Sequence, residues 1–363
     1  MTVKIIISGL PGDMATRVYN VIKQTDNVEL AKTSNPVALT GLKIKDHIID
    51  EAYRLRYAEK NGIDLVAPES HDDILAVLKD MHKDSLIGIN FATKEGFDVN
   101  FKFAEHKIPF IYGGTGATDE QKTELKEAVR KNNIPAIVAS NMCPHIVGLQ
   151  KTINNISNIS QINLAYHNLS VIESHQEGKQ DTSGTAKDMI NYFNKMGTNY
   201  QVETLKKEGM IRDPEEQLKM GIPKEYLSGH GWHNYILYSQ EKSECIDMLA
   251  NLVCDFMIKD PLFLDYQMSH KRSDAEGIMP KKSYLQSIIK KLAEDKYFKG
   301  ELFRFSKDKI VGFSVSLIPK QLAMISHNIN GRYPYALGAI KQALPFLVEK
   351  AEKGRTYEMI DII

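Results

Sequence analysis

Residues 3–15 read VKIIISGLPGDMA, an apolar run rich in β-branched residues that ends in a glycine-rich turn. Gly9, Gly12 and Ala15 form a G-x-x-G-x-x-A pattern, a variant of the turn that joins the first strand of a dinucleotide-binding sheet to its helix. Glycine is needed there because the backbone turns sharply and a pyrophosphate approaches the amide groups of the helix N-terminus. A turn that needs glycine for steric reasons alone is the alternative. The predicted cofactor residues of this turn are Gly9, Pro11, Gly12, Asp13 and Met14.

Short apolar runs alternate with longer amphipathic stretches as far as residue 156. Apolar runs at residues 86–91, 109–112 and 136–139 are each followed by a stretch with helical spacing. Short buried strands linked by crossover helices form a parallel sheet with helices on both faces, and such a sheet binds ligands at the carboxyl ends of its strands. We therefore predict an α/β fold with a Rossmann-type, doubly wound parallel sheet in residues 1–156.

The pattern changes after residue 156, where longer strand-like runs stand beside a single clear helical stretch. This change indicates a second, C-terminal α+β domain over residues 157–333. Its predicted elements are a strand at residues 161–172, a helix at 183–196 and further strands at 232–238 and 324–329.

Two other parts of the chain are set apart by their composition. Residues from about 241 to 313 are rich in Lys, Phe and Met, and the interleaved Glu and Asp residues indicate a solvated helical face rather than a membrane-surface helix. We predict a mainly helical insertion there. The final stretch, residues 334–363, contains a helix that ends at Gly354, and we expect it to return to the first domain.

The charge balance excludes two classes of partner. The 363 residues include 46 Lys and Arg against 46 Asp and Glu, without a basic tract long enough to follow a phosphate backbone. We therefore expect a small ligand, and neither nucleic acid nor a membrane surface, and no run of about 18 apolar residues could span a membrane. The three cysteines lack metal-ligand spacing and no secretory signal is visible, so we expect reduced thiols, no metal site and a cytoplasmic protein.

The residues after the predicted second strand bear on the choice of cofactor. A carboxylate at this place binds the ribose 2′-hydroxyl of NAD and repels a 2′-phosphate. The chain has Lys32, Thr33 and Ser34 there instead, and a cation with hydroxyl groups attracts a 2′-phosphate. We predict NADPH as the cofactor, with NADH as the alternative. A Lys32 side chain that is merely solvated is the other interpretation of this residue.

A second glycine cluster, YGGTGA at residues 112–117, follows another predicted strand. Small residues at the end of a strand leave room for a nicotinamide ring. Residues that close the strand before it are expected to cover a ribose of the cofactor, and an ordinary glycine turn is the alternative. The predicted cofactor residues are Gly113, Gly114 and Thr115, with Phe91 and Ala92 from the other strand.

Residues 173–186, ESHQEGKQDTSGTA, form a polar stretch between a predicted strand and a predicted helix. Ser183, Gly184 and Thr185 would place free backbone N–H groups at the helix N-terminus, an arrangement that suits a carboxylate. A helix N-cap at Ser183 or Thr182, without a ligand, is the alternative.

Two titratable side chains precede this helix start. Lys179 can neutralise an anion or deliver a proton, and His175, which titrates near neutrality, can do the same. Together with the helix N-terminus they predict a site where an anionic substrate receives protons. Surface positions for both side chains are the alternative.

These motifs, in this order, resemble the dihydrodipicolinate reductase (4-hydroxy-tetrahydrodipicolinate reductase) family, in particular its plant-like branch. The family signature E-x-H-H-x-x-K-x-D-x-P-S-G-T-A is matched over residues 173–186, with Gln176 in place of the second His and one residue missing before Ser183. The G-T-T-G loop of the family is matched at residues 113–116, and its G-x-x-G-x-M turn at residues 9–14. Further similarity lies in residues 140–142, 221–223, 228–233, 327–332, 335–338 and 357–361.

The resemblance implies an NAD(P)H-dependent oxidoreductase that reduces 4-hydroxy-tetrahydrodipicolinate or dihydrodipicolinate to tetrahydrodipicolinate in diaminopimelate and lysine biosynthesis. It implies that residues 1–156 bind the dinucleotide, and that residues 157–333 bind the small dicarboxylate substrate and form a homodimer or homotetramer. By the same resemblance, His175 and Lys179 are the catalytic pair, Thr115, Gln176, Ser183, Gly184 and Thr185 bind the substrate, and Asn141 and Met142 join the cofactor residues.

Two other functions stay open. Gln176 brings no charge where the family has a second imidazole, so a related reductase of another anionic cyclic imine is one alternative. A non-catalytic regulator that binds NADPH is the other. The presence of both His175 and Lys179 speaks against the regulator, because a sensor needs no proton donor beside a carboxylate site.

Overall fold

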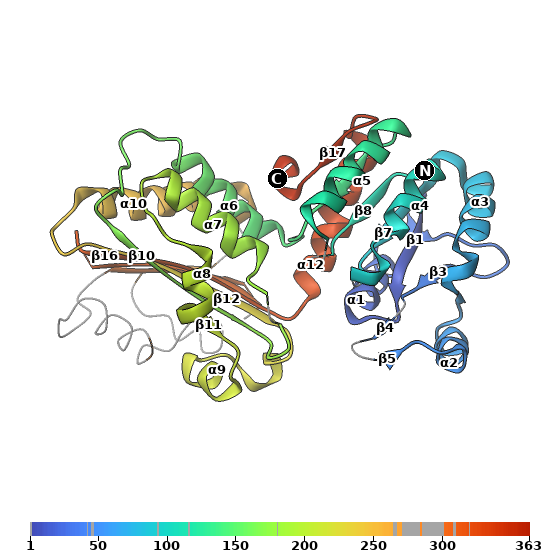
Figure 1. The fold of residues 1–363 in the computed structure, drawn as a ribbon, viewed down its shortest axis with the longest axis horizontal. Helices are drawn as coiled ribbons and strands as arrows, with labels where there is room; N and C mark the ends of the chain where they lie inside the picture. The colour runs from blue at the N-terminus through green and yellow to red at the C-terminus, as the bar shows by residue number, and fades with distance from the viewer. Residues whose placement is uncertain are drawn as a thin grey trace. The chain divides into compact units, whose positions relative to one another are not determined.

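The computed structural model describes residues 2–41, 43–44, 47–92, 94–114, 117–179, 181–263, 267–270, 284, 301–307, 310–318 and 320–363. The chain divides into two compact units (Figure 1). Unit 1 consists of Met1–Pro144 and Tyr333–Ile363, and unit 2 is His145–Arg332. The C-terminal stretch thus belongs to unit 1. The boundary between the two units lies at the start of the helix that ends at Ile156, whereas the sequence analysis placed the domain boundary at the end of this helix.

Unit 1 is built on an eight-stranded sheet whose strands pair in parallel. The strand order is β17-β9-β8-β7-β1-β3-β6, and β2 pairs with β1. The predicted Rossmann-type parallel sheet is therefore confirmed. The strands are β1 (Val3–Leu10), β2 (Val28–Leu30), β3 (Val37–Thr40), β6 (Asp64–Val66), β7 (Leu86–Asn90), β8 (Phe110–Tyr112), β9 (Ala136–Val138) and β17 (Thr356–Tyr357).

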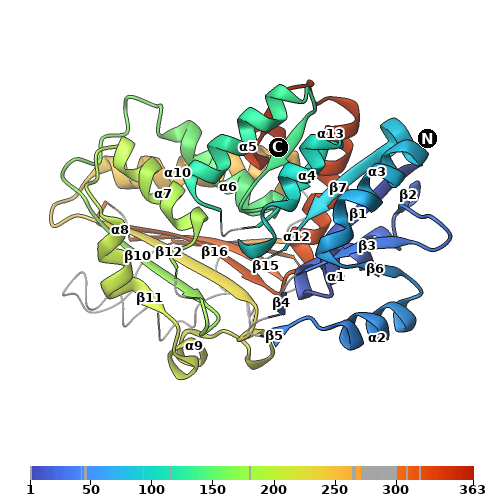
Figure 2. The same ribbon diagram turned by 45° about the vertical axis from the view of Figure 1, so that its right-hand side comes forward.

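Helices connect the strands of unit 1, as expected for crossover connections (Figures 1 and 2). The long helices are amphipathic: α1 buries Ala15, Val18 and Ile22, which lie on one face at helical spacing. A two-stranded hairpin of β4 (Lys43–Ile44) and β5 (His47–Ile48) precedes α2. The helices are α1 (Asp13–Ile22), α2 (Glu51–Asn61), α3 (His71–His82), α4 (Val99–Glu105), α5 (Asp119–Lys131), α12 (Tyr333–Gly338), α13 (Leu344–Glu349) and α14 (Met359–Ile362).

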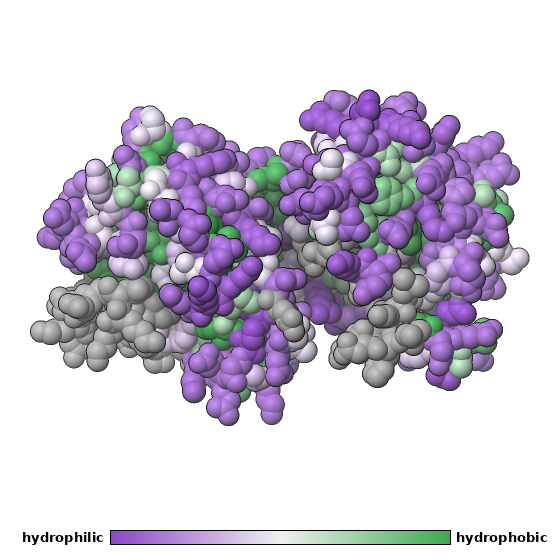
Figure 3. Space-filling view, viewed as in Figure 1, coloured by the Kyte–Doolittle hydropathy of each residue, from purple (hydrophilic) through white to green (hydrophobic). Residues whose placement is uncertain are grey.

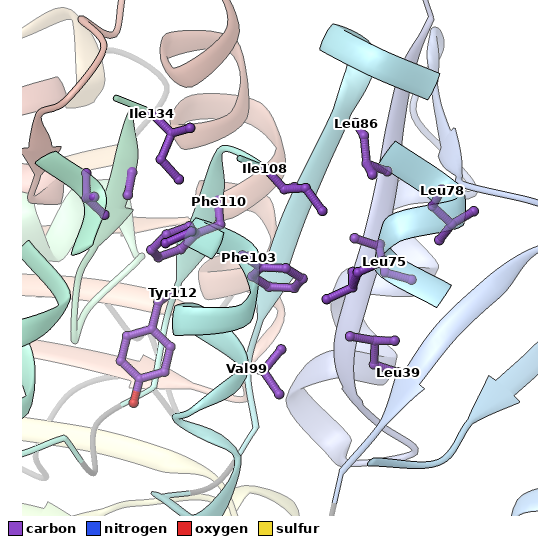
Figure 4. Close-up of a cluster of buried hydrophobic side chains, with 14 of the residues drawn as sticks. Leu39, Leu75, Leu78, Leu86, Val99, Phe103, Ile108, Phe110, Tyr112 and Ile134 are labelled. Carbon is purple, nitrogen blue, oxygen red and sulfur yellow. The ribbon is translucent and has the colours of Figure 1, made fainter. Parts of the chain in front are cut away.

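The core of unit 1 lies between the parallel strands and the helices that cover them (Figure 4). Every side chain from Ile5 to Leu10 is buried, because a central parallel strand is covered on both faces. Phe103 and Phe110 pack against each other with ring centroids 6.0 Å apart, next to the aliphatic residues of α3 and β7. Phe110 and Leu86 are the first residues of β8 and β7, so this packing covers the amino ends of these two strands.

Unit 2 contains a seven-stranded sheet in the order β11-β10-β12-β16-β15-β14-β13. β11 pairs with β10 in parallel, and the other neighbours are antiparallel. The predicted α+β character of this part is confirmed. The strands are β10 (Asn168–His175), β11 (Met210–Ile211), β12 (His230–Tyr238), β13 (Gln267–His270), β14 (Glu301–Lys307), β15 (Val311–Ile318) and β16 (Leu322–Asn330).

Helices α6, α7 and α10 lie on the same face of this sheet (Figures 1 and 2). On that face the Phe193 ring of α7 lies 5.7 Å from the Tyr235 ring of β12. The surfaces of both units that face the viewer in Figure 3 are mainly hydrophilic, with small scattered apolar areas. The helices of unit 2 are α6 (Pro144–Ile156), α7 (Gly184–Lys195), α8 (Val202–Thr204), α9 (Pro214–Met220) and α10 (Glu244–Lys259).

The prediction of a mainly helical insertion at about residues 241–313 is wrong for much of the described part. Its first section forms α10, but β13, β14 and the start of β15 extend the sheet instead. The stretches ELFRFSK and VGFSVSLI alternate apolar and polar residues with the two-residue period of a strand, and the Lys content of this region obscured that pattern. Between residues 271 and 300 the structure describes only Tyr284, which is helical, so the prediction for the rest of this stretch lies outside the described residues.

Other elements agree with the predictions more closely. The strand predicted at residues 161–172 begins later, at Asn168, and continues to His175. Within the described ranges, none of the helices has the length and the apolar character needed to cross a membrane. Cys143 and Cys254 are buried, and Cys245 is partly exposed.

Candidate active site

Strand β10, a loop and helix α7 position the polar stretch of residues 173–186. The strand ends at His175, and α7 begins at Gly184 with Ser183 as its N-cap. The Ser183 Oγ accepts a hydrogen bond from the N–H of Ala186 at 3.1 Å, as an N-cap serine does. The predicted helix start is therefore present. The loop between the strand and this helix contains Lys179.

Glu173 is the fully buried centre of this site. Its Oε2 accepts hydrogen bonds from the N–H of Ser183 at 3.1 Å and from the Ser183 Oγ at 2.9 Å, and its Oε1 accepts one from Arg212 Nη2 at 2.6 Å. Burial raises the pKa of Glu173, but the neighbouring His233 and the hydrogen bond from Arg212 outweigh burial and hold this pKa far below its usual range. Glu173 is therefore an ionised carboxylate that only accepts hydrogen bonds.

The hydroxyl of Ser183 is shared between Glu173 and His233. Its oxygen lies 2.9 Å from His233 Nε2, and its single proton goes to the ionised carboxylate of Glu173. His233 Nε2 must then carry a proton and donate it to the serine oxygen. Neither the N–H nor the hydroxyl of Ser183 is open to a ligand while Glu173 holds both.

His175 presents one unsatisfied nitrogen to the site. Its Nδ1 lies 2.9 Å from the carbonyl oxygen of His230, so Nδ1 carries a proton. Its Nε2 is buried and has no hydrogen-bond partner. Burial and then the neighbouring His233 lower the pKa of His175 well below its usual value, so the ring is neutral near pH 7 with a free lone pair on Nε2.

Lys179 is half-buried at the far end of the loop. Its N–H donates to the carbonyl of Gln176 at 2.9 Å, which closes a turn. Burial lowers the pKa of the Lys179 ammonium, Glu173 opposes that effect, and Arg212 adds to it. A lysine whose pKa lies closer to neutrality gives up a proton more readily at neutral pH.

Two histidines and a tyrosine that the sequence analysis did not single out as site residues form a row of rings that begins at His175. The His175 and His233 rings meet edge to face at 5.1 Å, and His233 stacks on His327 at 4.4 Å. His327 Nε2 lies 3.2 Å from the hydroxyl of Tyr235. The signal that could have found them is strand register, because His233 and His327 are direct partners across β12 and β16.

Glu173, His175 and His233 have ligand atoms that lie within 4.8 Å of one another, close enough to share a metal ion. The rest of the chemistry fits a hydrogen-bonded network better. Arg212 occupies one oxygen of Glu173 and Ser183 occupies the other, and a guanidinium beside a divalent cation is unfavourable. The free lone pair of His175 Nε2 therefore suits a donor group or a proton.

The first glycine-rich turn in unit 1 lies at the end of β1, where its backbone packs closely against the backbone that follows β7. Gly9 has a φ of +104°, and a Cβ there would lie 2.8 Å from the backbone N of Ala92. A Cβ on Gly12 would lie 2.7 Å from the carbonyl oxygen of Gly9. Gly12 is also the N-cap of α1, without a side-chain hydrogen bond to the first turn. Both glycines are sterically required, and the N-terminus of α1 keeps backbone N–H groups for an anion.

The second glycine cluster lies at the same edge of the sheet. β1, β7 and β8 are neighbours, and the N–H of Gly113 donates to the carbonyl of Asn90 at 3.0 Å. A Cβ on Gly113 would lie 2.0 Å from the Phe91 ring, and a Cβ on Gly114 would lie 2.4 Å from the Tyr112 hydroxyl. The structure thus brings Gly9 against Ala92, and Phe91 against Gly113. Thr115 lies outside the described residues.

The remaining predicted cofactor residues also follow strands of this sheet. Asn141 Oδ1 accepts a hydrogen bond from the N–H of Cys143 at 2.9 Å, and the carbonyl of Met142 lies against Gly338 of α12. After β2, the backbone of Lys32 lies within hydrogen-bond distance of His82 Nε2. The side chains of Lys32 and Ser34 are exposed, and that of Thr33 is partly exposed.

The parallel sheet with its glycine-rich strand ends has the architecture of the dinucleotide-binding class of proteins, and the second unit carries a buried histidine–carboxylate site. Residues 3–142 match the family model described as dihydrodipicolinate reductase, N-terminus. Through these residues, which are less than half of the chain, the protein is similar to the N-terminal part of dihydrodipicolinate reductases.

Relatives with assigned names agree with this family. A protein of Oryza sativa subsp. japonica, named as a probable chloroplastic 4-hydroxy-tetrahydrodipicolinate reductase 2, is 27% identical over 251 residues, which are 68% of this chain and 71% of that protein. The chloroplastic 4-hydroxy-tetrahydrodipicolinate reductase 2 of Arabidopsis thaliana is 34% identical over 146 residues, 40% of each chain. The Arabidopsis match thus spans well under two thirds of its relative.

A solved structure supports the fold. The dipicolinate-bound dihydrodipicolinate reductase from Paenisporosarcina sp. TG-14 aligns over 100% of both chains with a TM-score of 0.51 and 15% sequence identity. At this identity the likeness concerns the fold alone. The predicted combination of a Rossmann-type sheet with a second mixed-sheet part is confirmed by it.

Proposed function

We propose that this protein is an NAD(P)H-dependent reductase of 4-hydroxy-tetrahydrodipicolinate or dihydrodipicolinate, and that it forms tetrahydrodipicolinate in diaminopimelate and lysine biosynthesis. The observation that carries the proposal is the buried, unpartnered Nε2 of His175, at the end of β10, just before the loop that bears Lys179 and leads into the N-terminus of α7. Such a site suits an anionic substrate that takes up a proton. The family match of residues 3–142 and the relatives' names support the substrate.

His175 and Lys179 are the proposed proton-transfer pair. The neutral His175 accepts a hydrogen bond at Nε2, and the negative charges of a dicarboxylate raise its pKa, because an opposite charge nearby favours the protonated form. His175 then becomes an acid only after the substrate has bound. Lys179 neutralises a carboxylate or supplies the proton when burial has lowered its pKa.

The substrate carboxylates are proposed to bind around the start of α7. Gly184 and Thr185 present the first turn of that helix, and Gln176 supplies an amide donor without a charge. Thr115 belongs to the same proposed set. Ser183 is also a proposed substrate-binding residue. Its N–H and its hydroxyl both donate to Glu173, so at least one of these hydrogen bonds must break before Ser183 can bind the substrate.

The cofactor is proposed to bind at the glycine-rich ends of β1, β7 and β8. The crowded backbone at Gly9 and Gly12 and the uncapped N-terminus of α1 fit a pyrophosphate. When bound, the reduced dinucleotide supplies the hydride. Lys32, Thr33 and Ser34 favour NADPH over NADH, because this stretch has no carboxylate to repel a 2′-phosphate.

The assembly and the location are proposals too. We assign dinucleotide binding to unit 1, and substrate binding and formation of a homodimer or homotetramer to unit 2. A cytoplasmic location is part of the proposal, and it stands against the plant relatives, which are named chloroplastic. Size-exclusion chromatography with light scattering on the full chain measures the assembly directly.

The direct test follows the loss of NADPH absorbance. Its substrate is the condensation product of pyruvate and aspartate semialdehyde, generated freshly by the enzyme that catalyses the preceding step. NADH is run beside NADPH. We expect substrate-dependent oxidation that falls at least a hundredfold in His175→Ala and Lys179→Ala, since each proton donor contributes about two to four powers of ten, with cofactor affinity retained. Cofactor binding without oxidation would contradict the proposal and favour another anionic imine or a regulator.

A further inference from the structure

The segment from β11 to α9 holds the loop that carries the proposed proton-transfer pair. Arg212 follows β11, which pairs with the end of β10 at Glu173 and Ser174. The Nε of Arg212 donates to the carbonyl of Lys179 at 2.7 Å. Its Nη1 donates to the carbonyl of Glu173 at 3.2 Å, and its Nη2 donates to the Glu173 carboxylate at 2.6 Å. One side chain therefore joins the end of the strand to the far end of the loop.

Gln217 makes a second attachment from the same segment. Its Nε2 donates to the carbonyl of His175 at 2.7 Å and lies 3.5 Å from the carbonyl of Ile211. The Gln217 side chain is buried, and it is carried by α9, whose N-cap Asp213 follows Arg212 directly. The backbone of each residue in the proton-transfer pair is thus held by a side chain of one short segment.

We propose that Arg212 and Gln217 are positioning residues that hold the backbone carbonyls of Lys179 and His175, and so set where both proton-transfer groups lie. This inference rests on the proposed function for its catalytic part. Neither residue needs to touch the substrate. Their effect reaches the chemistry through the two residues that they hold.

Arginine suits this place for a geometric reason. A guanidinium has a planar set of donors that can bond to the Glu173 carboxylate and to two separate carbonyls at once. A lysine keeps the positive charge beside Glu173 but offers a single point of attachment. Arg212→Lys therefore separates the charge of this residue from its bridging role.

The charge of Arg212 also acts on Lys179. The groups that influence the Lys179 pKa are Glu173 and Asp181, which raise it, and Arg212 and Lys187, which lower it along with burial. Replacing Arg212 with glutamine removes a cation near Lys179. It also leaves the negative charge of Glu173 without its ion-pair partner, so Glu173 stabilises the Lys179 ammonium more strongly. Both changes raise the pKa of Lys179. A protonated Lys179 donor then persists to higher pH, so the alkaline limb of the rate profile moves upward.

The test compares Arg212→Lys, Arg212→Gln and Gln217→Met in the full-length protein, with Arg130→Gln on the exposed surface of α5 as the matched control. Hydrogen exchange of the Lys179 amide, which bonds to the Gln176 carbonyl, reports the loop. NADPH oxidation gives kcat, KM and the pH profile. We expect exchange to be at least tenfold faster in Arg212→Lys and kcat about tenfold lower, with KM and NADPH affinity within threefold.

Each outcome decides the proposal. Faster exchange with unchanged kcat, or reduced kcat with unchanged exchange, overturns it, and so does an Arg212→Gln profile whose alkaline limb does not move upward relative to Arg212→Lys. If the Arg212 variants do not fold, Gln217→Met decides: kcat about tenfold lower with KM and NADPH affinity within threefold supports the proposal, and an unchanged kcat overturns it. If the unmodified protein does not oxidise NADPH, the proposed function fails, while the exchange rates still show whether the two side chains hold the loop.

Discussion

Replacing Glu173 with glutamine removes the charge at the centre of the unit 2 site while it keeps the shape of the side chain. Three donor groups point at the carboxylate, two from Ser183 and one from Arg212. An amide has only one acceptor oxygen, so its NH₂ group faces a donor. A buried donor without a partner costs about 1–3 kcal/mol, and a buried ion pair that loses one partner costs about 3–5 kcal/mol.

We expect Glu173→Gln to lower the free energy of unfolding of unit 2 by about 3 kcal/mol at pH 7, the lower end of that range. The lower end applies because Arg212 is 16% exposed and keeps its bonds to carbonyls. Urea unfolding followed by the fluorescence of Trp232, the single tryptophan, reports unit 2 because this side chain is fully buried in β12. Glu203→Gln, at an exposed site in the same unit, is the control.

The stabilisation that Glu173 provides should also depend on pH, in a direction that follows from its pKa. The pKa of Glu173 is lowered in the folded state, so its stabilisation is fully present above the unfolded pKa of about 4.3 and is lost as the pH falls through the folded pKa. The difference between the unmodified protein and Glu173→Gln should therefore shrink on acidification. A difference below about 0.5 kcal/mol at pH 7, the size typical of a surface substitution, would refute the reasoning.

Three further predictions concern the separate sites. Gly9→Ala should weaken NADPH binding at least tenfold in a fluorescence titration, because a Cβ would lie 2.8 Å from the backbone N of Ala92, whereas Gly62→Ala, at a positive φ with open space around it, should leave binding unchanged. Lys32→Ala should raise the Kd for NADPH about tenfold, the loss of roughly one charge-assisted hydrogen bond, and leave NADH unaffected; equal losses for both cofactors, or for the surface control Lys60→Ala, would contradict a 2′-phosphate contact. Nitrogen-15 NMR at pH 7 should show His175 as the neutral Nδ1–H tautomer, and added dipicolinate should raise its pKa; a charged ring or an Nε2–H tautomer in the free protein would contradict the assignment.

The parallel sheet of unit 1 could be predicted because its signals are local. The β-branched run before Gly9 and the short apolar runs that follow each carry their own strand signal, and the glycine turn marks the first crossover. The predicted helix at residues 183–196 agrees with α7 within one residue at each end. Such elements can be predicted because they depend on interactions between residues that are close in the sequence.

The inner residues of the unit 2 site could not be predicted in the same way. His233 meets His327 only because β12 and β16 pair in one particular register, and Arg212 reaches Glu173 only because β11 lies beside β10. Contacts between residues this far apart depend on which strands become neighbours, and a single sequence does not specify that. The strands β13 and β14 were hidden for a different reason, because a high Lys content looks like a helical surface.

The division of the chain has a consequence for protein synthesis. Unit 2 is one uninterrupted stretch, His145–Arg332, whereas unit 1 needs Tyr333–Ile363 as well as its first part. During translation all of unit 2 is synthesised before β17, the strand of the unit 1 sheet that pairs with β9. The N-terminal part of unit 1 must therefore wait, with the edge at β9 unpaired, until the second unit has been synthesised.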